Sequence, residues 1–144
     1  MRVLVQRSGK SSVSVNGDII GKIDNGLVLF VGFTEGDNKE KIEFLAKKVV
    51  NLRIFDDENG VMNKSILDYG GDVLSISQFT LYADTKKGNR PSYINAMGGE
   101  EAIKLYDSFN EELRKYVNVE TGEFGADMTV QITNIGPITI SLEK

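Results

Sequence analysis

Apolar residues recur at alternate positions along the first third of the chain, as is typical of β-strands, and the first strand is expected to be buried at least in part on both faces. The alternation starts at Val3, and the pair Asn16-Gly17, where both residues tolerate a positive φ, predicts a two-residue hairpin turn. A return strand is expected at 19–23, followed by a very apolar strand at 27–33. Together these segments predict an antiparallel meander.

Two later segments change to the spacing of an amphipathic helix. The first covers residues 38–51, and Asp37 with Glu40 three positions later predicts a capping box at its start. The second covers about 100–116. Shorter apolar runs predict further strands, at residues 53–55, 73–81, 117–120, 128–133 and 138–142.

Clusters of strands with two separate helices predict a mixed α/β domain. The 144 residues are enough for one domain with a hydrophobic core, and no linker, low-complexity stretch or repeat divides them. We therefore expect one compact domain over residues 1–144.

Composition bears mainly on the compartment. Cysteine is absent, so no disulfide framework is available and a reducing cytoplasm is expected. No apolar run approaches the roughly 20 residues that a membrane helix needs. The N-terminus also lacks the long apolar stretch of a signal peptide. The sequence therefore predicts a cytoplasmic protein with no membrane partner.

The absent residue types restrict the chemistry further. Without histidine or cysteine the chain has no Ser-His or Cys-His dyad, no imidazole ligand for zinc and no thiolate. Catalysis must use carboxylates, hydroxyls, lysine, backbone dipoles or groups of the substrate itself.

The formal net charge of −4 argues against broad nonspecific binding of nucleic acid, and no DNA partner is expected. One local cluster, formed by Lys86, Lys87 and Arg90, is a candidate for phosphate contacts. The alternative is a solvated loop, which is what most charge runs are.

Two short motifs carry the functional argument: SQFTL at 77–81 and NIGPIT at 134–139. Taken singly, the first reads as a half-buried strand and the second as a turn around Gly136-Pro137. An activated serine at Ser77 would need a general base, and the sequence places none beside it.

Taken together, the motifs make the chain resemble the D-aminoacyl-tRNA deacylases. The resemblance extends over nearly the whole chain and includes the segments MRVLVQR (1–7), LRIF (52–55), ADTKKG (83–88) and TGEFGADM (121–128). It implies β-sheets, largely antiparallel, layered with helices on one side. It also implies a homodimer whose active sites lie at the subunit interface, because the Gly-Pro loop enters the neighbouring subunit's site.

The resemblance implies an activity as well: hydrolysis of the ester at the 3′ end of D-aminoacyl-tRNA, and of mischarged glycyl-tRNA, as a proofreading step without metal or cofactor. Ser77, Gln78, Phe79 and Thr80 would form the catalytic segment. The backbone N–H groups of Phe79 and Thr80 would be an oxyanion hole. Since no base accompanies the Thr80 hydroxyl, we favour attack by water assisted by the ribose 2′-OH.

The same resemblance gives Gly136-Pro137 the role of chiral selector. Joined by a cis peptide bond, the two residues would turn their carbonyls toward the substrate's α-ammonium, and their backbone would exclude an L side chain. Arg7 would hold this loop. Phe124 and Met128 would line the pocket for the terminal adenine, although a phenylalanine such as Phe124, taken in isolation, is more often plain core.

One departure from the family pattern lies beside the selector. Ile135 and Ile138 stand where the family usually has Asp and Val, so the support of the Gly-Pro loop is expected to differ. Two alternatives stay open: a noncatalytic protein that binds RNA ends, and a structural dimer without a ligand. Turnover separates deacylase from binding protein, and binding of charged tRNA separates the latter from a structural dimer.

Overall fold

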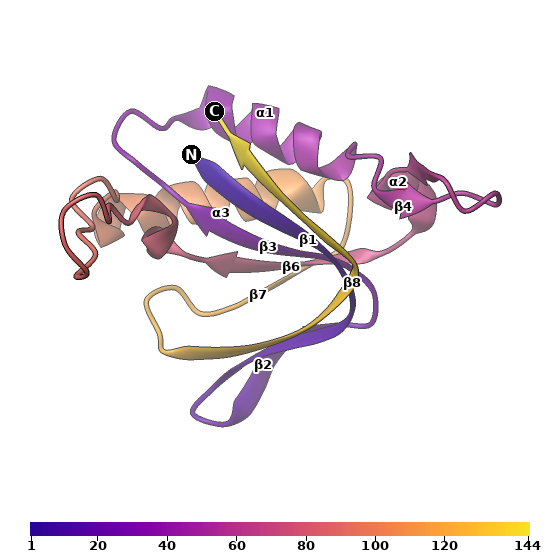
Figure 1. Cartoon of the computed structure of the whole chain (residues 1–144), viewed down its shortest axis with the longest axis horizontal. Helices are drawn as coiled ribbons and strands as arrows, with labels where there is room; N and C mark the ends of the chain where they lie inside the picture. The colour runs from indigo at the N-terminus through magenta and orange to yellow at the C-terminus, as the bar shows by residue number, and fades with distance from the viewer.

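The fold is organised around one long strand, β1 (Arg2–Val15), in a six-stranded sheet (Figure 1). The computed structural model describes residues 1–144. One edge of β1 pairs antiparallel with β8 (Met128–Glu143) along its whole length. The other edge pairs with β3 (Gly26–Gly32) near the start of β1 and with β2 (Asp18–Ile23) near its end.

The predicted hairpin is present, with Asn16 and Gly17 at φ +52° and +88°. The predicted meander is wrong, because β2 and β3 do not pair with each other. β1 is long enough for β2 and β3 to pair with the same edge of it, one after the other. Residues 2–32 therefore form one extended hairpin, whose second arm is interrupted between β2 and β3.

The remaining strands extend the sheet in parallel. β6 (Asp72–Ser77) pairs with β3, and β7 (Val119–Thr121) pairs with β6. Parallel neighbours need crossover connections. The two long helices, α1 (Lys39–Val50) and α3 (Gly99–Arg114), lie in these crossovers. The other pairings are antiparallel, so the prediction of a mixed, largely antiparallel sheet is confirmed.

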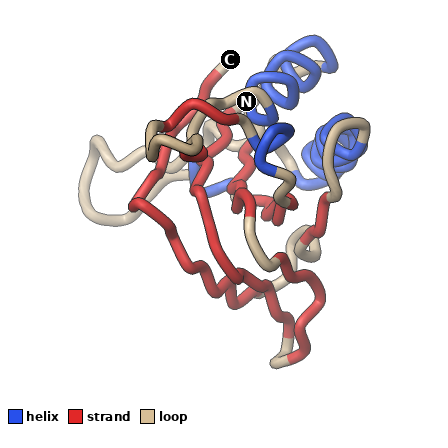
Figure 2. The backbone as a smooth tube through the Cα atoms, turned by 90° about the vertical axis from the view of Figure 1, so that its right-hand side faces the viewer, coloured by secondary structure: helices blue, strands red, loops and turns tan.

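Both long helices cover the same face of the sheet, as Figure 2 shows. The N-cap of α1 is Asn38, whose side chain accepts a hydrogen bond from Lys41 N at 3.1 Å, and not Asp37 as predicted. The Asp37 carboxylate is buried and instead accepts hydrogen bonds from the Met1 amino group at 2.5 Å and from Lys41 Nζ at 3.1 Å.

A third, short helix was not predicted. α2 (Ile66–Tyr69) follows a small hairpin of β4 (Phe55–Asp56) and β5 (Met62–Lys64). Ser65 caps α2 and bonds reciprocally with Asp68. The sequence did not indicate this helix for two reasons. Its capping box has Asp where the usual pattern has Glu or Gln, and four residues are too few to show a helical periodicity.

Residues 134–139 depart from the prediction of a turn between two strands. β8 continues through them, but its register with β1 shifts. Gln6 pairs with Thr139 and Ser8 pairs with Asn134, so an advance of five residues along β8 corresponds to two residues along β1. The extra residues bulge away from the ladder. Gly136 and Pro137 lie in this bulge and are exposed.

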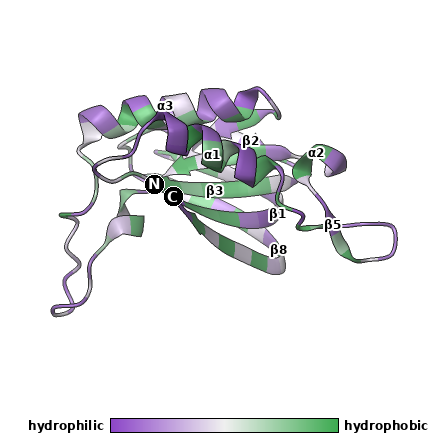
Figure 3. Cartoon of the chain, turned by 90° about the horizontal axis from the view of Figure 1, so that it is seen from above, coloured by the Kyte–Doolittle hydropathy of each residue, from purple (hydrophilic) through white to green (hydrophobic).

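The sheet curls, so both faces of its centre are buried. The larger core lies under α1 and α3 and includes Leu27 and Val73. A smaller cluster on the opposite face, with Val28, Leu74 and Ile76, is covered by the far halves of β1, β2 and β8. Figure 3 shows the resulting distribution, with hydrophobic strands beneath helices whose outer faces are polar. None of the helices combines the length and apolar character needed to cross a membrane.

Candidate active site

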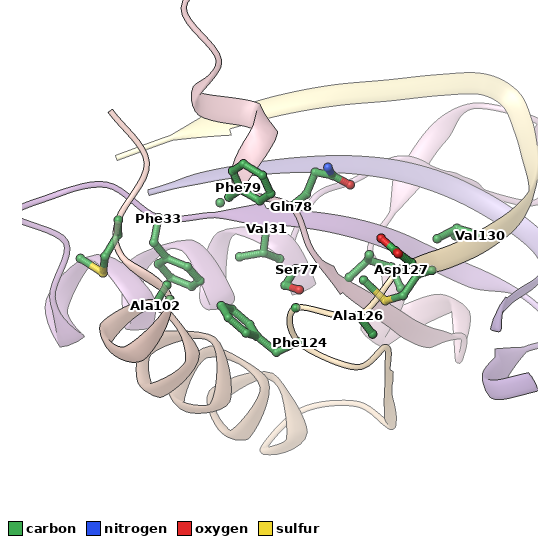
Figure 4. Close-up of a pocket in the computed structure, with 16 residues that line it drawn as sticks. Val31, Phe33, Ser77, Gln78, Phe79, Ala102, Phe124, Ala126, Asp127 and Val130 are labelled. Carbon is green, nitrogen blue, oxygen red and sulfur yellow. The ribbon is translucent and has the colours of Figure 1, made fainter. Parts of the chain in front are cut away.

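A cavity of about 480 Å³ lies where β3 and β6 end, between the start of α3 and the loop that follows β7. The carboxyl ends of parallel strands are a common place for ligand sites. In Figure 4, Gln78 and Phe79 lie on one side of the cavity and Phe124 and Ala126 on the other. The lining is mostly apolar, with Asp127 as its one ionisable side chain.

The strand predicted over 73–81 ends early, at Ser77. Gln78 N still donates to Val31 O at 2.7 Å, but the next residues form a short 3-10 helix, η1 (Phe79–Tyr82). The buried ring of Tyr82 anchors the far end of this turn. Alternation of side chains along a strand therefore does not apply beyond Ser77.

The turn leaves two neighbouring backbone donors without partners inside it. Its first internal hydrogen bond runs from Leu81 N to Gln78 O at 3.3 Å, so the N–H groups of Phe79 and Thr80 precede the bonded part. Phe79 lines the cavity. This geometry suits the recognition of an anionic or carbonyl oxygen.

The hydroxyl of Thr80 accepts a hydrogen bond from the side-chain amide of Gln78. Ser77 and Gln78 line the cavity, whereas Thr80 does not. An amide N–H cannot remove a proton, so this contact gives the Thr80 hydroxyl no general base. The structure also brings together no group of three Asp or Glu side chains that could hold a metal ion.

The opposite wall contains Phe124 and Met128, the two residues predicted to line the adenine pocket. The Phe124 ring packs against Tyr106 with ring centroids 5.9 Å apart. A Cβ at Gly122 would lie 2.5 Å from Met128 Sδ and 3.3 Å from Ile76 Cδ1, so a larger residue there would displace the Met128 side chain. Packing against these neighbours therefore helps to position Phe124 and Met128 in the cavity wall.

Gly136 and Pro137 do not reach the cavity of their own chain. The strand that carries them is three strand spacings from β6, or roughly 14 Å across the sheet. The predicted cis bond is also absent, since the structure contains no cis peptide bond. The trans isomer is the usual state of an X–Pro bond and is favoured by about 0.5–1 kcal/mol, and both residues of the pair are exposed in the bulge.

Arg7, predicted to hold this loop, contacts the bulge through one hydrogen bond. Its Nε donates to Ile135 O at 3.3 Å, and its Nη1 donates to Ile54 O at 2.8 Å and to Asp56 Oδ1 at 3.2 Å. The Arg7 side chain is 11% exposed. With Ile at position 135, the guanidinium pairs with a carboxylate from β4.

The basic residues Lys86, Lys87 and Arg90 are exposed in the loop after η1 and form no ion pair in the structure. Sequence reasoning missed other parts of the cavity wall, namely Val31, Phe33, Met97, Ala102 and Asp127. These residues belong to separate elements and share no motif. The one local signal was the Gly98-Gly99 pair at the start of α3.

Comparison with known proteins agrees with this geometry. A family model described as D-Tyr-tRNA(Tyr) deacylase matches residues 4–143. The chain is 55% identical to D-aminoacyl-tRNA deacylases of Clostridium botulinum and Bacillus cytotoxicus. Each alignment covers 100% of this chain. It covers 97% of the C. botulinum protein and 99% of the B. cytotoxicus protein.

Two solved structures are also similar. One, described as c-Myc DNA Unwinding Element Binding Protein, has a TM-score of 0.95 at 40% identity and covers 100% of this chain and 99% of its own. The other, a probable eukaryotic D-amino acid tRNA deacylase, has a TM-score of 0.83 at 17% identity, with coverage of 98% and 97%, and so supports the fold alone.

Fold and matches together define a class, the aminoacyl-tRNA hydrolases. Within this class the chain belongs to the D-aminoacyl-tRNA deacylase family, whose reaction is a proofreading step on tRNA.

Proposed function

We propose that the cavity between β6 and α3 holds the acylated terminal adenosine of D-aminoacyl-tRNA. The observation that carries the proposal is the start of η1 beside this mostly apolar cavity, where the N–H groups of Phe79 and Thr80 have no hydrogen-bond partner within the turn. The ester carbonyl lies against these donors, and the adenine lies between Phe124 and Met128. Stacking of a base on an aromatic ring contributes about 1–3 kcal/mol.

Hydrolysis then proceeds by attack of water on the ester carbonyl, assisted by the 2′-OH of the terminal ribose. The tetrahedral intermediate places its negative oxygen on the Phe79 and Thr80 N–H groups. Fixed donors of this kind are worth roughly 3 kcal/mol each. Collapse of the intermediate releases the 3′-oxygen of the tRNA and the free D-amino acid.

The Thr80 hydroxyl is not the nucleophile in this mechanism. Because it accepts from Gln78 and faces no base, Thr80→Ala is expected to retain kcat within about tenfold, since its backbone N–H remains. Single-turnover hydrolysis of D-Tyr-tRNA measures this. Loss of turnover in a folded variant that still binds tRNA would instead make Thr80 the nucleophile.

Selection against L substrates is assigned to Gly136-Pro137 of a second subunit in a homodimer. The separation of this pair from the cavity of its own chain supports that assignment. With the Gly136–Pro137 bond trans, one backbone carbonyl of the pair receives the α-ammonium, and the backbone of the pair leaves room for a side chain in the D direction only. Glycine has no side chain to exclude, so glycyl-tRNA is also a substrate. Arg7 positions the pair, and the cluster of Lys86, Lys87 and Arg90 contacts tRNA phosphates.

The test is hydrolysis of D-Tyr-tRNA and L-Tyr-tRNA side by side, with a chelator present and enzyme at low concentration. Release from the D ester alone is the expected result. Equal release from both esters would refute chiral selection, and release from neither would favour a noncatalytic protein that binds RNA ends.

A further inference from the structure

Two aromatic rings are exposed together at the rim of the cavity. Phe79 and Tyr93 meet edge to face, with ring centroids 5.0 Å apart and planes at 72°. Their side chains are 55% and 41% exposed. Phe79 lines the cavity, so the Tyr93 ring is the next aromatic surface outside it.

The segment that carries Tyr93 is tied to the residues that directly follow β3 at the cavity. Thr34 Oγ1 donates to Asn95 O at 2.7 Å, and Met97 N donates to Phe33 O at 2.9 Å. A further bond of 2.9 Å runs from Ala96 N to Tyr93 O. Since Phe33 and Met97 both line the cavity, the segment with Tyr93 is tied directly to its wall.

A positively charged loop leads to this aromatic pair. Two backbone hydrogen bonds between Asp84 and Ser92, of 2.8 and 2.9 Å, close the loop over residues 85–91, which projects from the left of the molecule in Figure 1. It presents the three basic residues described above, none of them in an ion pair. In a chain of net charge −4, this is a local excess of positive charge directly before Tyr93.

We propose that the Phe79–Tyr93 pair is a stacking surface for the unpaired nucleotides that precede the terminal adenosine, with the basic loop on their phosphates. This inference rests on the proposed function, which puts the adenosine in the adjacent cavity. Exposed aromatic rings beside free cations are the combination that binds single-stranded nucleic acid. The second subunit of the proposed homodimer reaches the cavity through Gly136-Pro137, whereas a symmetric contact over the basic loop itself would bring two sets of like charges together.

The experiment compares two substrates, D-Tyr-tRNA and the minimal ester D-tyrosyl-adenosine. For Tyr93→Ala, kcat/KM on the tRNA is expected to fall about 5- to 150-fold more than on the minimal ester, as loss of base stacking predicts. Tyr93→Phe keeps the ring and should stay close to wild type on both. Tyr116→Ala, which removes a ring of similar exposure (43%), is the matched control.

Equal losses on both substrates, or dissociation of the Tyr93→Ala oligomer in light scattering, would overturn the inference and leave the deacylase function standing. Binding of a fluorescent RNA oligonucleotide ending in CCA provides a readout that does not need turnover. If wild type and Tyr93→Ala bind this RNA equally, the stacking surface is refuted. Absence of D-Tyr-tRNA hydrolysis by wild type would refute the proposed function separately.

Discussion

Phe79 brings two different groups to the cavity, an aromatic ring and a backbone N–H, and substitution can separate them. Phe79→Ala removes the ring only, whereas Phe79→Pro removes the ring and the donor. Proline fits the first position of a helical turn, and Gln78 before it has an extended φ of −146°. We expect kcat for D-Tyr-tRNA to be about 10²–10³ lower in Phe79→Pro than in Phe79→Ala. Equal kcat values in the two variants would remove Phe79 N–H from the oxyanion hole.

Tyr82 gives a prediction about stability at high pH. Its hydroxyl is buried without a hydrogen-bond partner, and burial raises the pKa of Tyr82 to about 12. The folded state therefore keeps this proton between pH 10 and 12 while the unfolded state loses it, so stability falls as pH rises through that window. The full fall is at most about 3 kcal/mol, and solvent screening of this partly accessible group reduces it.

Tyr82→Phe should lose less stability than wild type over this pH range. At pH 7 it should leave the free energy of unfolding nearly unchanged, because no hydrogen bond is removed. Tyr106→Phe is the contrasting variant. Its hydroxyl donates to Ser75 O at 2.8 Å in a buried site, so its loss should cost about 1–2 kcal/mol at pH 7. Urea unfolding at several pH values measures both, and similar costs for the two variants would contradict the assignment.

At the scale of elements, the parallel pairing of β3 with β6 depends on one glycine. Gly26 has φ +136°, and a Cβ there would lie 1.9 Å from Asp72 O. Gly26→Ala should destabilise the protein by at least about 3 kcal/mol, since backbone strain adds to a backbone clash. Gly36→Ala, at φ +83° with open space around it, should cost only about 1–2 kcal/mol. Thermal unfolding of the pair measures the difference, and equal costs would refute the clash.

Elements with a strong local signal could be predicted from sequence. The Asn16-Gly17 turn and both long helices carry such signals, and their bounds were within about two residues of the structure. The end of β6 at Ser77 carries none, because its cause is the burial of Tyr82, five residues later. The N-cap of α1 is Asn38 and not the predicted Asp37, whose carboxylate instead binds the amino group of Met1. No local sequence pattern contains this contact.

For the site, the motifs predicted correctly which segments lie at one cavity. They did not predict the backbone arrangement of those segments. Ser77, Gln78, Phe79, Phe124 and Met128 do line one cavity. Gly136 and Pro137 lie outside it, in a bulge set by the pairing of β8 with β1. That pairing joins the two ends of the sequence, and its register cannot be read from either strand alone.

At the scale of the whole molecule, a site shared between two subunits is open to a complementation test. One subunit carries Phe79→Pro, and the other carries Pro137→Trp, which in the proposed homodimer would place a bulky ring in the cavity of its neighbour. Each variant alone should be inactive on D-Tyr-tRNA. Random assortment after mixing gives mixed dimers with one intact site, so about a quarter of wild-type activity should return. No recovery in verified mixed dimers would place the whole site within one chain.

The pairing of β8 along the full length of β1 also has a consequence for synthesis. β1 is made early and β8 last, yet β8 is the only strand on that edge of β1. At about 5–20 residues per second, the edge waits roughly 5–25 s for its partner. An unpaired edge of this kind can pair with another chain, so nascent or truncated chains are the aggregation-prone species, and chaperones are needed most during that interval.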